Sequence, residues 1–112
     1  MPQKISVPFH LSRAPGTEAF ETAYQVPAAK KFNLCEVEVI MTGTPAGKLQ
    51  IAVYHGIRKV APNGGVFQLG EGRTVARAEY TFNSGEKVLV WSKNTHDANT
   101  YDADVVLEGE LT

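Results

Sequence analysis

Apolar and polar residues alternate with a period of two along most of this chain, whereas the 3.6-residue period of an amphipathic helix is nearly absent. Loops rich in glycine, proline and polar residues separate the alternating segments. The predicted strands cover residues 5–12, 18–26, 32–42, 48–55, 74–82, 87–93 and 101–111, with a short additional strand at 66–69. Such spacing is typical of an antiparallel sandwich or barrel. We therefore predict one all-β domain over residues 1–112, a jelly-roll-like antiparallel β-sandwich of seven to eight strands.

The alternation also predicts which residues face the core. Residues 5–12 contain Pro8, which cannot donate to a strand ladder, so they are expected to form an edge strand. Cys35 falls on the same predicted face as Val37 and Val39, and is therefore expected to be a small buried apolar residue. In the second strand the same rule places four residues on one face: Phe20, Thr22, Tyr24 and Val26.

Residues 56–73 break the pattern. They hold five glycines, one proline and scattered apolar residues, which indicates a long excursion between two strands. If one core cannot take all these apolar side chains, the remainder form an exposed patch at which copies of the chain associate. The candidate interface residues are Ile57, Val60, Val66, Phe67, Leu69 and Arg73.

Composition narrows the possible partners. The chain is 43% hydrophobic and 21% charged, which predicts a folded domain. Its 11 basic and 12 acidic residues give a net charge of −1, so we expect no nucleic-acid partner and no anionic membrane surface. No apolar run reaches the roughly 20 residues of a membrane helix.

Charges of each sign are nevertheless segregated along the chain. The acidic group lies on one face of the last strand: Asp102, Asp104, Glu108 and Glu110. The basic group surrounds the excursion: Arg58, Lys59, Arg73 and Arg77. Surfaces of opposite charge can form a head-to-tail contact between copies, so we expect a homo-oligomer.

Candidate catalytic groups are few. A mononuclear metal site in a small barrel usually draws on histidines two residues apart, and His10, His55 and His96 show no such spacing. A small metal-dependent β-barrel enzyme that uses these three histidines is an alternative. No serine has a Gly-x-Ser-x-Gly setting. We therefore predict a protein that is not an enzyme and has no cofactor or metal.

Aromatic residues offer a second alternative, a carbohydrate-binding module. Tyrosine and tryptophan combine an apolar ring with a polar atom, so an exposed row of them can stack on sugar rings. The candidate platform is Tyr54, Tyr80, Trp91 and Tyr101. The competing interpretation is that these rings pack in the core.

The cysteine content points to a reducing compartment. Cys35 is the only cysteine, so no intrachain disulfide is possible. Residues 1–8 lack the apolar run of a secretory signal. We expect the protein in the cytoplasm, or in a virus particle that assembles inside a cell.

Two stretches resemble known jelly rolls and together cover about half the chain. The first holds Val26-Pro27-Ala28-Ala29-Lys30-Lys31-Phe32, Val37 and Val39, and Gly43-x-Pro45-x-Gly47-Lys48-Leu49-Gln50-Ile51, and is similar to galactose-binding-like folds. The second runs from Asn94-Thr95-His96 to Asp102-Ala103-Asp104-Val105-Val106-Leu107-Glu108-Gly109, and resembles small jelly-roll proteins that decorate virus capsids. The resemblance implies a non-catalytic module and transfers no functional residue.

These observations favour a structural or assembly protein. The sequence predicts a β-sandwich that associates with copies of itself and docks on a larger assembly such as a virus capsid.

Overall fold

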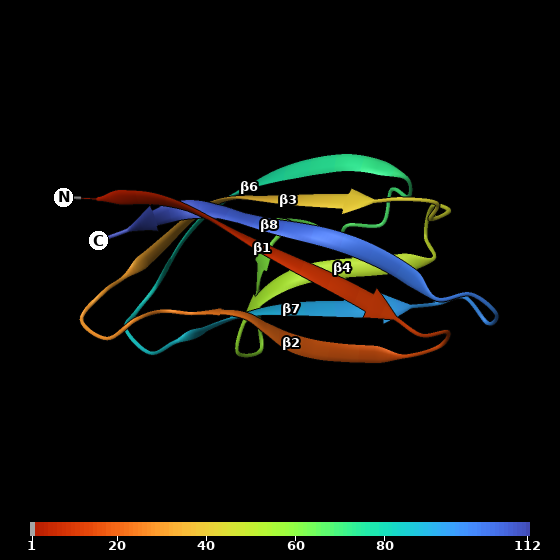
Figure 1. Ribbon diagram of the computed structural model, residues 1–112, viewed down its shortest axis with the longest axis horizontal. Coiled ribbons are helices and arrows are strands. Elements are labelled where there is room, and N and C mark those ends of the chain that lie inside the picture. The colour runs from red at the N-terminus through yellow and green to blue at the C-terminus, as the bar shows by residue number, and fades with distance from the viewer. Residues whose placement is uncertain (1) are drawn as a thin grey trace.

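Eight strands form two four-stranded antiparallel sheets in the computed structural model, which describes residues 2–112 (Figure 1). The strands are β1 (Gln3–Arg13), β2 (Glu18–Gln25), β3 (Phe32–Met41), β4 (Leu49–His55), β5 (Arg58–Ala61), β6 (Gly72–Phe82), β7 (Lys87–Asn94) and β8 (Tyr101–Leu111). The first sheet has the order β1-β8-β3-β6 and the second β2-β7-β4-β5. This order is that of a jelly roll, so the predicted fold class is confirmed. Among the described residues, no helix is long and apolar enough to cross a membrane.

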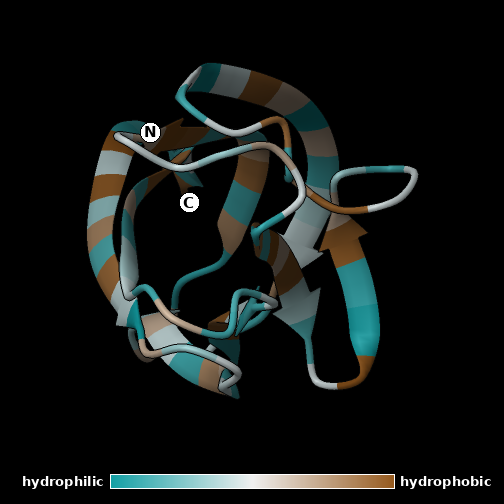
Figure 2. Ribbon diagram, turned by 90° about the vertical axis from the view of Figure 1, so that its right-hand side faces the viewer, coloured by the Kyte–Doolittle hydropathy of each residue, from teal (hydrophilic) through white to brown (hydrophobic). Residues whose placement is uncertain are grey.

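The pairing of β1 with β8 shows most directly how the sequence pattern gives the fold. The two strands pair without interruption from Gln3 opposite Leu111 to Arg13 opposite Tyr101. The alternating bands of polar and apolar residues along the strands are visible in Figure 2. β1 lies at the edge of its sheet, as Pro8 predicts.

The core lies between the two sheets and receives large side chains from both. The largest fully buried side chains are Phe32, Phe82, Leu11, Leu34, Leu49, Ile51 and Leu107. Burial of one such side chain contributes about 1.5–3 kcal/mol, so this layer is the main source of stability. Every buried side-chain nitrogen or oxygen in the described part of the chain has a hydrogen-bond partner.

Cys35 is exposed, so its predicted burial is wrong. The register of β3 shifts between Leu34 and Glu36 in its pairing with both neighbouring strands. Leu34 and Val37 therefore both face the core although three positions separate them. A β-bulge of this kind adds one residue and turns it away from the regular alternation, and here that residue is Cys35.

A second irregularity separates the residues that alternation placed together in β2. Its pairing with β7 shifts between Thr22 and Tyr24. Val26 is buried and Tyr24 packs on Phe32 in the core, with ring centroids 5.2 Å apart. Phe20, on the other side of the shift, is 53% exposed on the outer face of the second sheet.

The excursion between β4 and β6 is more ordered than the sequence suggests. A tight turn at Gly56, whose φ is 61°, leads into β5, which the alternation pattern did not predict. The strand predicted at 66–69 is instead a single bridge between Phe67 and Ile51. Three residues after this bridge, Gly70 has a φ of 86°, a backbone conformation that favours glycine.

Candidate assembly surfaces

The apolar residues of the excursion divide between core and surface. Phe67 is only 3% exposed, because its backbone N–H and C=O both bond to Ile51 and carry its ring into the core. Phe67 is therefore not available as an interface residue, contrary to the prediction. Val60 packs partly against the core and Val66 is half-buried. The side chains of Ile57 and Leu69 are 100% and 74% exposed.

The two exposed apolar residues lie at opposite ends of β4. Ile57 lies two residues after the end of β4, in the turn to β5. Leu69 lies next to Gln68, whose carbonyl accepts from the N–H of Gly47 just before β4 begins. A seven-residue strand spans about 23 Å at about 3.3 Å per residue. Among the predicted interface residues, the exposed apolar ones therefore occupy two separate positions rather than one patch.

A basic groove lies between β5 and β6, where the two sheets meet on one side of the sandwich. It has a volume of about 590 Å³. The lining residues are Arg58, Lys59, Val60, Asn63, Ala76, Arg77, Ala78, Glu79 and Tyr80. The Arg58 guanidinium lies over the Tyr80 ring, 5.4 Å from its centroid, which is within the range of a cation–π interaction. Three of the four predicted basic residues thus line one groove.

Arg73, the fourth, lies near the start of β6, outside the groove, and pairs with a carboxylate of the neighbouring strand β3 instead. Its guanidinium is 2.7 Å from Glu38 and lowers the pKa of that carboxyl. The Arg73 side chain is exposed, and its charge neutralises part of the outer surface of the first sheet. As a predicted interface residue, Arg73 is accessible but already paired.

The acidic face is the outer surface of the first sheet, where β8 lies between β1 and β3. Asp104 is 2.8 Å from Nδ1 of His10, and this hydrogen bond raises the pKa of His10. Ser6 donates to Glu108 at 2.5 Å. Asp102 and Glu110 are on the same face, as the alternation predicted. The face is acidic, and its charge is partly neutralised at one edge by His10 of β1 and at the other by Arg73 of β6.

The four residues of the predicted sugar platform are not brought together. Tyr101 is buried in the core, and Tyr80 packs between the sheets. Tyr54 and Trp91 do share the outer face of the second sheet, because β4 and β7 are neighbours. Phe20 joins them there, although the sequence pattern gave no indication of it.

The resulting aromatic group on the outer face of β2, β4 and β7 has a defined geometry. The rings of Phe20 and Tyr54 meet edge to face, with centroids 5.2 Å apart. The indole N–H of Trp91 donates to the Glu18 carboxylate at 2.7 Å. Phe20 lies directly opposite Trp91 in the pairing of β2 with β7. Three aromatic residues on neighbouring strands therefore form one surface.

His55 belongs to a hydrogen-bonded chain that the sequence analysis missed. Its Nδ1 lies 2.5 Å from the Tyr80 hydroxyl, and its Nε2 lies 2.7 Å from Glu86. Glu86 also accepts the backbone N–H of Asn83, and this bond and the His55 contact lower its pKa. Both ring nitrogens are occupied, so His55 joins β4 to the β6–β7 turn. Tyr80 and Glu86 are 25 and 31 residues from His55 in the sequence, so only the structure reveals these hydrogen bonds.

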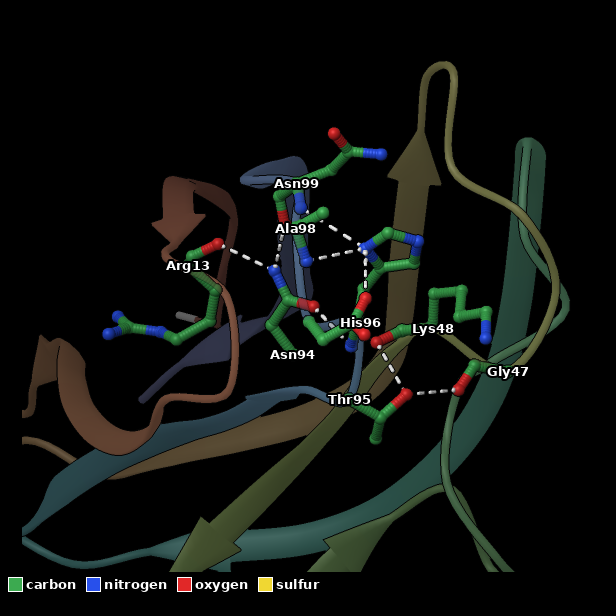
Figure 3. Close-up of polar contacts among 9 residues, drawn as sticks. Arg13, Gly47, Lys48, Asn94, Thr95, His96, Ala98 and Asn99 are labelled. Carbon is green, nitrogen blue, oxygen red and sulfur yellow. Dashed lines mark hydrogen bonds and ion pairs between the residues drawn. The ribbon is translucent and has the colours of Figure 1, made fainter.

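His96 lies in the loop after β7 and is held through one ring nitrogen (Figure 3). Its Nδ1 accepts the backbone N–H groups of Ala98 and Asn99 at 3.0 and 3.1 Å. The fully buried side chain of Asn94 donates to the carbonyls of Arg13 and Asn99 and accepts from the N–H of His96 (Figure 3). Residues 94–99 are therefore held by their own polar groups.

The three histidines lie in different places and meet different partners. His10 bonds to a strand carboxylate, His55 to Glu86 and Tyr80, and His96 to its own loop. Across residues 2–112, the structure contains no group of three or more His, Cys, Asp or Glu residues that could hold a metal ion. The candidate surfaces are thus the two exposed apolar positions, the basic groove and the aromatic group.

Comparison with known proteins bears on the fold rather than on these surfaces. No protein-family model matches the chain, and no curated protein matches it in sequence. It is similar to a chain of the acidic stable capsid of Helicobacter pylori bacteriophage KHP30, with a TM-score of 0.59, 18% identity, and coverage of 97% of this chain and 93% of that chain.

Two further structures resemble it more weakly. One is FLHE, with a TM-score of 0.47 and 12% identity over 96% of both chains. The other is from infectious bursal disease virus Gx strain, with a TM-score of 0.48 and 12% identity over 99% of this chain and 31% of that chain. The chain is thus a two-sheet β-sandwich whose fold resembles that of a chain of the phage KHP30 capsid.

Proposed function

We propose that this protein is a structural subunit that associates with copies of itself and docks on a larger assembly such as a virus capsid. The observation that carries the proposal is the pair of exposed apolar side chains, Ile57 and Leu69, at the two ends of β4. Exposed large aliphatic side chains lower the free energy when a partner covers them. The likeness of the fold to a phage capsid chain agrees with this role.

The placement of these residues favours one kind of contact. Because Ile57 and Leu69 lie at opposite ends of the same strand, one copy can present Ile57 to the Leu69 end of the next. A contact between two different surfaces is heterologous, and repetition of it gives a ring or an extended array. Association with a virion, rather than residence as a free cytoplasmic protein, is the location that this role favours.

Sedimentation velocity over a wide range of protein concentration tests the proposal. We expect the native chain to associate as concentration rises, and a double variant Ile57→Asp with Leu69→Asp to stay monomeric. The matched control is Thr22→Asp, which adds a charge at an exposed polar position in the middle of β2, between the two ends of the sandwich, and should associate like the native chain. Circular dichroism must show that both variants keep the native fold. A native chain that remains monomeric at every concentration would contradict the proposal.

The aromatic group supports a second candidate function, the binding of carbohydrate. The observation that favours it is the contact of Phe20 with Tyr54 beside Trp91 on an outer face. Such rings can stack on the apolar face of a sugar, and the Glu18 carboxylate beside the indole can accept from a sugar hydroxyl. A glycan array that shows binding to the native chain and none to Phe20→Ala would support it. The same array with no signal for the native chain would exclude it.

A further inference from the structure

β6 is an edge strand whose second backbone edge has no strand paired to it. Among the described residues, β6 pairs with β3 alone. On its other side lies β5, which has four residues against eleven in β6. A strand with one neighbour leaves alternate N–H and C=O groups free to bond to another chain.

The other edge of the same sheet is protected in a way that β6 is not. β1 carries Pro8 in its middle, which removes a donor and obstructs the addition of another strand. β6 contains no proline between Gly72 and Phe82. Of the two edges of the first sheet, β6 is therefore the one suited to accept a strand.

The basic groove lies along this unpaired edge. Its walls include the small side chains of Ala76 and Ala78 on β6 and of Val60 on β5. Small side chains leave the β6 backbone accessible, and an added strand would lie about 4.8 Å from it. The groove has a volume of about 590 Å³, which admits a short extended segment rather than a folded domain.

The charge of the groove selects among possible occupants. Arg58, Lys59 and Arg77 line it, and Glu79 is the one acidic residue among the lining residues. The Arg77–Glu79 pair is 3.9 Å apart and exposed, so it is a weak pair, and Glu79 offsets only one of the three positive charges of the lining. The chain as a whole carries a net charge of −1, so this basic groove is a local reversal of sign. An occupant with carboxylate side chains is complementary to it.

We propose that the β6 edge and the basic groove beside it bind an extended acidic segment of a partner polypeptide, which adds to the first sheet as a fifth strand. Backbone hydrogen bonds to β6 supply much of the affinity, and Arg58, Lys59 and Arg77 select for carboxylates. This inference rests on the proposed function in one respect, namely that the partner polypeptide belongs to the larger assembly on which the protein docks. The binding surface itself is separate from the exposed side chain of Leu69.

The test uses the full chain and a fluorescently labelled synthetic peptide in which Glu and Val alternate. Fluorescence anisotropy should show saturable binding that weakens as salt concentration rises. A peptide of the same length with Lys in place of Glu should not bind. A version methylated on alternate backbone nitrogens should also fail, because it cannot complete the ladder with β6.

Protein variants locate the binding site. Arg58→Glu with Arg77→Glu should weaken binding of the acidic peptide about tenfold or more, because two attractive charges become repulsive. Lys93→Glu makes the same kind of charge change on an exposed residue of the second sheet, and should leave the affinity unchanged. Circular dichroism of each variant establishes that it is folded. Amide NMR shifts caused by the peptide should concentrate in residues 72–82.

Three results would overturn the proposal. The first is the absence of binding, or equal binding of the acidic and basic peptides. The second is an equal loss of affinity in Lys93→Glu. The third is a shift of the β6 amides as protein concentration rises without peptide, which would place a second copy on this edge. Because the self-association test uses Ile57 and Leu69 and no peptide, either proposal can fail alone.

Discussion

The imidazole of His55 lies 2.7 Å from the Glu86 carboxylate and connects the end of β4 to the turn between β6 and β7. The second ring nitrogen meets the Tyr80 hydroxyl, and the ring packs on Tyr80 and Phe82 with centroids 5.4 and 5.1 Å apart. β4 belongs to the second sheet and β6 to the first. This contact therefore fastens the two sheets to each other at one end of the sandwich.

Glu86 should make the stability of the protein sensitive to acid. Its pKa is lowered from 4.5, mainly by the Asn83 backbone N–H, so it stabilises the fold above its ordinary pKa. That contribution is lost as the pH falls through the lowered pKa. We expect the native chain to lose stability below about pH 4.5 more steeply than Glu86→Gln does. Urea unfolding across the acidic range measures this, and parallel curves for the two proteins would contradict it.

His10 should give a dependence of the opposite sign at higher pH. Its pKa is raised above 6.5, mainly by the hydrogen bond to Asp104, so the charged pair stabilises the fold fully below about pH 6.5. The contribution disappears as the pH rises through the raised pKa. Urea unfolding from mildly acidic to mildly basic pH measures this. The free energy of unfolding of the native chain should fall by the contribution of the pair, whereas that of His10→Asn and of Asp104→Asn should not. Equal slopes in all three proteins would show that the pair has no such effect.

Neighbouring apolar residues of the excursion should differ sharply when shortened to alanine. Phe67→Ala removes a ring from the core and should lower the free energy of unfolding by about 3–5 kcal/mol. Leu69→Ala removes an exposed side chain and should change it by less than about 0.5 kcal/mol. Chemical denaturation of both variants measures the difference. Similar losses in the two would mean that the core does not include Phe67.

Gly109 should not tolerate even one additional carbon. A Cβ there would lie 2.4 Å from the Asn33 carbonyl oxygen and 2.6 Å from the Phe32 ring, because β8 and β3 are neighbours at this point. We expect Gly109→Ala to cost about 1–3 kcal/mol of stability, as overpacked cores do. Gly64→Ala is the control, since a Cβ there would meet nothing within 4 Å. Thermal unfolding compares the two, and equal melting temperatures would refute the close packing.

The sequence predicted the strands best where alternation runs without a bulge. β1 and β8 keep their register over their whole length, so the edge position predicted for residues 5–12 and the acidic face predicted for the last strand are both correct. In β3 one added residue reverses the faces after Leu34, which is why Cys35 was placed in the core. A bulge has no signature in a single sequence, because it depends on pairing with a neighbouring strand.

The candidate surfaces were less accessible to prediction, for a related reason. The basic residues Arg58, Lys59 and Arg77 were recognised as a group, but only the position of β5 beside β6 shows that they line a groove. Glu86 was not recognised at all, since its partner His55 is distant in the chain. Strand order in the sheets decides which residues share a surface. Alternation in the sequence predicts where the strands are, but it does not predict which strands are neighbours.

The position of β8 at the centre of the first sheet governs when this protein can fold. β8 separates β1 from β3 and pairs with both, yet it follows all the other strands along the chain. During synthesis, residues 3–13 leave the ribosome before residues 101–111 and have no strand partner until those residues emerge. Closing so long a loop is slow, because its entropy must be lost before the new contacts form. β3 and β6 can pair earlier, but the first sheet is complete only after translation has passed residue 111.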